Sequence, residues 1–327
     1  MRPLVIACAL GGTMLLLALV LTSSPAAIVS IISGGAVPLV AASVYRVVPL
    51  SLYAISWRLL IAPVNRPGLS MLLRLRWIGE SVNALLPVAQ IGGDVARARL
   101  LAQQGVPGPI AAASMVADLG VGAASQVAFT ATGAVAFSLH GSLGALSRGI
   151  VIVCVALGAG AGALVFVARV GVGRILRRLG MLRALHAHAD TVDRALADIL
   201  ARRADLSLAF VLHLVGWFAQ VFETWLILHL IGVAVSAAGA LAIESLALAA
   251  RSAVFVVPGG VGVQEGALML LAAPFGIDAP VALSLGLIKR MREVLVGAPA
   301  VIAWSIAERH LLDRLWRRLT RRSRGET

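Results

Sequence analysis

The chain has 327 residues, of which 60% are hydrophobic and 13% are charged, and its mean hydropathy is +0.95. A soluble domain has about 25% charged residues, so this composition excludes an ordinary water-soluble enzyme and indicates a membrane protein. The formal net charge of +13 would indicate nucleic-acid binding only if the basic residues clustered on a water-exposed face, so their positions decide what the charge means.

Long apolar stretches predict six membrane-spanning helices, because a hydrocarbon core needs about 20 apolar residues per helix. The predicted spans are residues 4–22, 36–61, 110–137, 150–168, 206–231 and 281–307. Arg46 lies inside the second span. A signal peptide is the alternative for the first span, but its apolar run is longer than usual and no clear small-residue cleavage site follows it.

The basic side chains between the predicted spans lie almost entirely on one side of the membrane. With a cytoplasmic N-terminus, 22 of them fall in cytoplasmic segments and only Arg148 falls outside. The positive-inside rule therefore predicts that both termini are cytoplasmic. Nucleic acid is not an expected partner, since the basic segments lack interleaved aromatic residues and any known binding motif. Anionic lipids of the inner leaflet are expected there instead.

The cytoplasmic segment 171–205 predicts two short amphipathic helices. Their apolar faces carry Ile175, Leu176, Leu179 and Leu182, and then Val192, Leu196 and Ile199. Arg-rich polar faces suit the headgroup layer of the membrane. The alternative is a solvated linker that folds back on the protein.

Two segments are too polar for ordinary spans and too apolar for plain loops. Residues 66–107 begin and end on the cytoplasmic side and contain Pro87 and Gly92-Gly93. Residues 236–278 lie between a span that ends outside and one that begins outside, and contain Pro258. An apolar segment broken by proline and glycine that returns to its own side predicts a re-entrant helix pair. Membranes tolerate such backbone only where it is buried in protein or lines a watery cavity.

A shift of 171 residues relates the two halves of the chain. It places residues 80–87 over 251–258, Asp94 over Glu265 and Asp118 over Lys289, and it places the second and third spans over the fifth and sixth. We therefore predict an all-α polytopic membrane protein with six full spans and two re-entrant helix pairs arranged as an inverted repeat, a common plan of secondary transporters. The alternative is an embedded enzyme or assembly subunit with accidental symmetry.

The predicted organisation is a single transmembrane domain followed by a short tail. The domain covers residues 1–308, with repeat 1 at about 4–137, repeat 2 at about 150–307 and the amphipathic cytoplasmic insert at about 171–205. Residues 309–327 form a basic cytoplasmic tail.

Charged residues inside the last predicted span indicate a buried site. Lys289, Arg290, Arg292 and Glu293 lie eight to twelve residues from the outer end of the span. Each would cost about 2.5–3.5 kcal/mol if it faced lipid, so they are expected to face an interior. Helical spacing places Glu293 one turn from Lys289 and Arg290, and it leaves Arg292 without a near partner. These charges either form fixed ion pairs or bound a polar cavity, where arginine would suit phosphate and carboxylate.

Other polar patterns in the sequence are weaker indications of a functional site. His213 and Glu223 are ten residues apart in the fifth span, which would allow a proton relay but more often reflects helix contacts. The glycines at 259–262 lack the strand and the spaced lysine of a phosphate-binding loop. Cys8 and Cys154 both lie inside predicted spans, so no disulfide framework or Cys-x-x-Cys metal site is expected. With no catalytic constellation, we expect neither an enzyme nor a cofactor.

The sequence resembles the flippase-like family typified by the membrane part of lysylphosphatidylglycerol synthases, and within it the branch associated with hopanoid biosynthesis. The matching motifs are Asn83-x-x-x-Pro87 leading into Gly92-Gly93-Asp94-x-x-Arg97, Asp118, Pro258-Gly-Gly-Val-Gly262-Val-Gln-Glu265-Gly266, and Arg290. The resemblance covers nearly the whole chain and implies a bacterial inner-membrane protein that moves a lipid between leaflets or serves its export. A basic segment of about 20 residues follows the last span, so a soluble aminoacyl-transferase domain and lipid aminoacylation are not expected.

We expect a lipid translocator whose cargo, by resemblance, is a hopanoid or related isoprenoid lipid, with its headgroup in a central polar cavity between the re-entrant tips. The alternatives are a non-transporting subunit that presents lipid to a biosynthetic enzyme, and an intramembrane lipid glycosyl or phosphoryl transferase. Direction, energy source and oligomeric state stay open. The expected substrate-binding and translocation residues are Glu80, Asn83, Pro87, Gly92, Gly93, Asp94, Arg97, Asp118, Arg251, Pro258, Gly259, Gly260, Gly262, Gln264, Glu265, Lys289, Arg290, Arg292 and Glu293.

Overall fold

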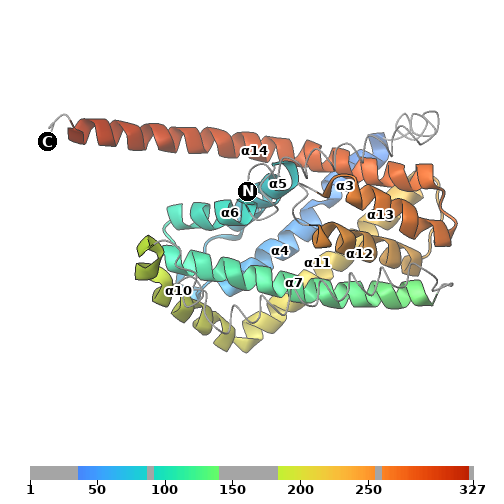
Figure 1. Ribbon diagram of the computed structural model, residues 1–327, viewed down its shortest axis with the longest axis horizontal. Helices are drawn as coiled ribbons and strands as arrows, with labels where there is room; N and C mark the ends of the chain where they lie inside the picture. Colours follow the sequence, from blue (N-terminus) through green and yellow to red (C-terminus); the bar gives the residue numbers. More distant parts are fainter. Residues whose placement is uncertain (1–35, 87–91, 140–182, 255–259, 324–327) are drawn as a thin grey trace.

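The computed structural model describes residues 36–86, 92–139, 183–254 and 260–323 (Figure 1). Every regular element within these ranges is a helix. The α-helices are α3 (Ala36–Tyr45), α4 (Val47–Leu60), α5 (Leu69–Leu85), α6 (Gly92–Gln103), α7 (Gly108–Ser138), α10 (Arg183–Ala201), α11 (Arg203–Leu230), α12 (Ala237–Ala253), α13 (Val263–Ala272) and α14 (Ala279–Ser323). Short 3-10 turns lie at Pro63–Asn65 and Ala273–Phe275.

Three helical stretches in the described residues are long and apolar enough to cross a membrane. They are α3 with α4, α7, and α11, and they confirm helices at the second, third and fifth predicted spans. Helix α14 contains the sixth predicted span and continues as a helix to Ser323, although its charges at 289–293 make it more polar than the other three. The predicted spans at 4–22 and 150–168 lie outside the described residues.

Arg46 lies at the junction of α3 and α4. Pro49 has no backbone N–H to donate to the carbonyl of Tyr45, so the helical hydrogen-bond pattern is interrupted one turn before it. The chain nevertheless continues in nearly the same direction, because the Arg46 N–H donates to the Ala42 carbonyl and the Leu50 N–H donates to the Arg46 carbonyl. A charged side chain thereby stands in the middle of an apolar stretch.

Each of the two proline- and glycine-containing segments forms a pair of helices. The first pair is α5 and α6, and the second is α12 and α13. Gly79 and Gly93 let α5 and α6 approach closely, since a Cβ atom on Gly93 would lie 1.9 Å from the Gly79 carbonyl oxygen. Gly262 precedes α13 with a φ of 79°, a conformation that favours glycine. The connections at 87–91 and 255–259 lie outside the described residues.

The two helix pairs lie between α7 and α14. In Figure 1, α14 runs along the top and α7 across the lower part, above α10 and the start of α11; α5 and α6 lie toward the left and α12 and α13 toward the right. Helix α4 packs on α11, α7 packs on α12, and α5 packs on α14. The α7–α12 contact is close, because Gly133 leaves room for the Ser245 side chain.

Each helix pair has its own apolar cluster. Trp57, Leu72 and Leu101 are buried between α4, α5 and α6. Ile243 and Leu268 belong to a larger cluster that joins α11, α12, α13 and the start of α14. Charged side chains from several helices meet in the space between the two clusters, and the candidate site lies there.

Helix α10, the second predicted amphipathic helix, folds back on the protein. Its apolar residues Leu196 and Ile199 are buried against Leu60 of α4 and Ala113 and Ala117 of α7. For this helix the structure therefore favours the folded-back arrangement over insertion of the apolar face into the headgroup layer. The first predicted helix of the insert, with Ile175, Leu176, Leu179 and Leu182, lies outside the described residues.

Candidate functional site

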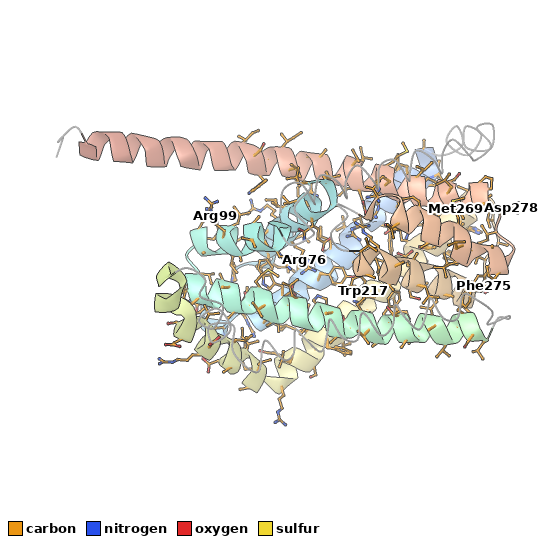
Figure 2. All side chains as sticks on the ribbon, in the orientation of Figure 1. Arg76, Arg99, Trp217, Met269, Phe275 and Asp278 are labelled. Carbon is orange, nitrogen blue, oxygen red and sulfur yellow. The ribbon has the colours of Figure 1, made fainter. Side chains whose placement is uncertain are left out.

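A cavity of about 640 Å³, whose wall carries many charged side chains as well as apolar ones, lies between the two helix pairs. This volume falls within the range of small-molecule sites, about 300–1,000 Å³. Its basic lining residues are Arg46, Arg76, Arg97, Arg251, Lys289 and Arg292. Its acidic lining residues are Glu80, Asp94, Asp118, Glu244 and Glu293. Figure 2 shows Arg76 near the middle of the molecule, far from Asp278 at the right-hand end.

Asp118 of α7 is the centre of the first charge network. Its Oδ2 atom accepts hydrogen bonds from Arg76 Nη1 at 2.6 Å and from Arg97 Nη2 at 2.8 Å. Its side chain is only 1% exposed. Arg76 also donates to Glu80 at 2.8 Å, and Arg46 donates to the other Glu80 oxygen at 2.7 Å. The network thus joins α4, α5, α6 and α7 at the cavity wall.

The N-terminus of α6 presents Asp94 to this network. Arg97 donates to Asp94 at 2.8 Å from one turn along the same helix. Asn83 of α5 accepts from the Gly93 N–H at 2.7 Å and donates to Asp94 at 3.2 Å. The first N–H groups of a helix have no partner within the helix, and the Asn83 amide oxygen satisfies one of them at Gly93. The Asp94 carboxylate in the first turn interacts favourably with the positive end of the helix dipole. This chemistry explains the Asn83 and Gly92-Gly93-Asp94 motif.

Aromatic rings support two of the arginines of this network. Arg76 lies over the ring of Tyr53 at 5.0 Å, and Arg97 lies over the ring of Trp57 at 4.9 Å. Such cation–π contacts hold a guanidinium group in place without using its N–H donors. His213 lies nearby, with Nε2 at 3.6 Å from Asp118 Oδ1 and Nδ1 at 2.7 Å from the Ser56 hydroxyl.

Glu293 of α14 is the centre of the second charge network. Arg251 of α12 donates to Glu293 at 2.6 Å and to Gln264 at 2.8 Å. Arg290 donates to Glu293 at 2.7 Å and to Glu265 at 3.1 Å. Glu265 in turn accepts from the Gly262 N–H at 2.7 Å and caps the start of α13. The second network therefore also ends at a helix N-terminus that carries an acid.

Two further ion pairs cross from α14 to its neighbours. The ammonium group of Lys289 donates to Glu244 of α12, which also accepts from the Thr224 hydroxyl at 2.6 Å. Arg292 pairs with Glu223 of α11, with 3.1 Å between Nε and Oε1. All four charged side chains are buried.

The structure brings ten of the predicted site residues to the cavity wall. These are Glu80, Asn83, Asp94, Arg97, Asp118, Arg251, Gln264, Lys289, Arg292 and Glu293. Glu265 and Arg290 lie behind the wall and pair with each other, and Gly92, Gly93, Gly260 and Gly262 shape the helix starts without lining it. Pro87, Pro258 and Gly259 lie outside the described residues.

Some partners differ from those that sequence spacing predicts. Glu293 pairs with Arg290 as expected, but Lys289 of α14 pairs with Glu244 of the neighbouring helix α12. Arg292 has a partner, Glu223, which spacing along α14 could not indicate.

Several lining residues were not among the predicted site residues. From the sequence, Arg76 is assigned to the cytoplasmic charges that orient the chain, whereas the structure places it at the cavity wall. Its position four residues before Glu80, one helical turn away, indicates the ion pair that it forms with that residue. Tyr53 and Glu244 were also missed. Among the described residues, no group of three or more His, Cys, Asp or Glu side chains is placed to hold a metal ion.

Comparison with known protein families indicates a membrane protein. A family model described as the lysylphosphatidylglycerol synthase TM region matches residues 4–300. Comparison with curated proteins and with solved structures found no match.

Proposed function

Because the chain belongs to the family of the lysylphosphatidylglycerol synthase TM region, we propose that it is a lipid translocator. The headgroup of a polar lipid enters the central cavity while its apolar tail stays in the bilayer. The cavity carries the proposal, because charged side chains at its wall would be costly in contact with lipid tails and are tolerated where they bound a polar space. In this proposal the protein lies in the bacterial inner membrane, and both of its termini are cytoplasmic.

The packing of the helices supports an inverted repeat. The proposed repeat relates α4 to α11, α5 to α12, α6 to α13 and α7 to α14. If this relation holds, the contact between α7 and α12 should have a counterpart between α14 and α5. Both contacts are present. The contact between α4 and α11 maps onto itself, as expected next to a pseudo-two-fold axis. With the predicted spans at 4–22 and 150–168, each repeat has three spans and one re-entrant pair. Related halves around one site are the usual basis of alternating access.

The cargo proposed from the sequence motifs is a hopanoid or related isoprenoid lipid. A rigid polycyclic or isoprenoid tail needs no binding site of its own in this mechanism, since the bilayer solvates it. The cavity recognises only the polar end of the lipid. The cargo assignment is therefore separate from the transport assignment and needs its own test with lipids that carry these tails.

A leaflet-exchange measurement tests transport. Purified protein in liposomes is expected to move a labelled polar-headed lipid between leaflets, whereas Ala123→Trp, which places a large ring at the cavity wall, is expected to reduce the rate at least tenfold. Ala131→Trp is the matched control, because Ala131 is exposed on the same helix. It is expected to keep the wild-type rate.

Two results would overturn the proposal. Equal rates for the two tryptophan variants would show that lipid does not pass through the cavity. If wild-type protein moved no lipid of the panel, but released product from a lipid acceptor and an activated donor, a transferase would replace the translocator.

A further inference from the structure

We infer that the cavity selects an uncharged headgroup rich in hydroxyl groups, such as a sugar or polyol, over headgroups that carry net charge. This inference rests on the proposed function and names its substrate class. The first observation is charge balance. Seven basic and seven acidic side chains are present when the lining residues are counted together with Glu223 and Arg290, which pair with lining residues, and with Glu265, which pairs with Arg290. The charges in and directly behind the cavity wall therefore balance, so no large excess of one sign favours an anion or a cation.

The second observation is that every charged lining side chain is already paired. Arg46 pairs with Glu80, Arg251 with Glu293, and Lys289 with Glu244. The remaining charged lining residues form the ion pairs described above for the two networks and for Arg292. A charged headgroup that binds one member of such a pair competes with the other member for it, and a charge that loses its partner in a buried site is strongly unfavourable. A neutral headgroup can bind beside the pairs without breaking them.

The third observation is that the most exposed pair keeps free donors and acceptors. The side chains of Arg46 and Glu80 are 20% and 25% exposed. Among the described residues, Arg46 donates to Glu80 through Nη2, which leaves other N–H donors of its guanidinium group available. Each Glu80 oxygen accepts one hydrogen bond from an arginine and has a second lone pair. A hydroxyl group both donates and accepts, so neighbouring hydroxyls can bind this pair from one side.

Aromatic and amide side chains complete a surface suited to a sugar or polyol. Trp77 and Trp217 line the cavity and are only partly buried, so they offer apolar rings to C–H groups. Gln126 and Gln220 line it as well, and the Gln220 amide donates to the Tyr53 hydroxyl at 3.0 Å. Neutral donors and acceptors thus alternate with apolar faces around the charged pairs.

The test compares three lipids that share one diacylglycerol anchor in the leaflet-exchange assay. Their headgroups are glucosyl (neutral), phosphoglycerol (anionic) and lysyl-phosphoglycerol (cationic). We expect the glucosyl lipid to move at least tenfold faster than either charged lipid. An equal or faster rate for a charged lipid would overturn the inference and leave translocation standing.

A binding measurement keeps the inference testable if no lipid is moved. Short-chain versions of the same three lipids are titrated into the detergent-solubilised protein, and the tryptophan fluorescence is followed. We expect the glucosyl lipid to bind at least tenfold more tightly than the charged ones. Failure of exchange with this selectivity intact would overturn transport alone, and absence of the selectivity would overturn the inference.

Charge variants of one pair provide the sharpest control. Glu80→Gln leaves the cavity with excess positive charge and is expected to raise the relative rate or affinity of the anionic lipid about tenfold. Arg46→Gln is expected to do the same for the cationic lipid. The double variant Arg46→Gln/Glu80→Gln restores balance and is expected to restore the preference for the neutral lipid. Unchanged preferences in both single variants would contradict selection by charge balance.

Discussion

The variant Asp118→Asn is expected to lower the free energy of unfolding by about 3–5 kcal/mol, the cost of removing one partner from a buried ion pair. Asp118 holds both Arg76 and Arg97 at less than 3 Å, so asparagine removes one of the two counter-charges of each guanidinium group and leaves Arg76 with Glu80 and Arg97 with Asp94 alone. Asparagine has nearly the same shape, so the loss would come from charge. Unfolding in mixed micelles, followed by tryptophan fluorescence, measures this change.

Asp205→Asn is the matched control for this prediction. Asp205 also accepts hydrogen bonds from two arginines, Arg66 at 2.8 Å and Arg202 at 2.6 Å, but its side chain is 29% exposed. An exposed pair contributes about 0–1 kcal/mol, so this variant is expected to lose no more than that. Similar losses for Asp118→Asn and Asp205→Asn would show that burial does not set the strength of the first network.

The second large effect is expected at Lys289 and Glu244. Lys289→Met leaves the carboxylate of Glu244 buried with only the Thr224 hydroxyl as a partner, and it is expected to cost about 3–5 kcal/mol of stability. Adding Glu244→Gln removes the uncompensated charge, so the double variant is expected to recover most of the loss. The measurement is a double-mutant cycle on the unfolding free energy.

The sign of the coupling decides this prediction. A double variant that is more stable than Lys289→Met alone supports a buried ion pair between α12 and α14. Additive losses would instead mean that the two side chains stabilise the protein independently, and the pairing across the helices would be wrong. The same cycle on the partly exposed pair of Arg202 and Asp205 is expected to give a coupling below about 1 kcal/mol.

The sequence predicts the helices better than the contacts between them. Apolar length is a property of one segment, so the helices at 36–60, 108–138 and 203–230 follow from composition alone. The interior position of Lys289 and Arg292 follows too, from the cost of charge in lipid. Their partners Glu244 and Glu223 lie on other helices, and only the packing of α14 against α12 and α11 brings them together.

Arg76 shows a limit of the positive-inside rule. The rule counts basic residues by segment and cannot separate an arginine in the headgroup layer from one turned into the protein. Arg76 lies within α5 and reaches Asp118 of α7, so its role depends on how α5 and α7 pack. The amphipathic pattern of α10 has the same limit, because the spacing of its apolar residues is the same whether that face contacts lipid or protein. Leu196 and Ile199 are buried against protein.

Accessibility of one side chain in the cavity can be measured from each face of the membrane. Gln126 of α7 lines the cavity, so Gln126→Cys, in a chain with Cys8 and Cys154 replaced by serine, provides a single thiol there. Val215→Cys is the control for a position exposed on the apolar helix α11, and it is expected not to react with a membrane-impermeant reagent. Asp198→Cys, exposed on α10, is expected to react from the cytoplasmic face only.

Headgroups from both leaflets must reach the same cavity if this protein is a translocator. We predict that Gln126→Cys reacts with the impermeant reagent applied from the outside and, in inverted vesicles, from the cytoplasmic side, and that a bound headgroup slows both reactions. Reaction from one side only, while the control thiols behave as expected, would contradict translocation through this cavity.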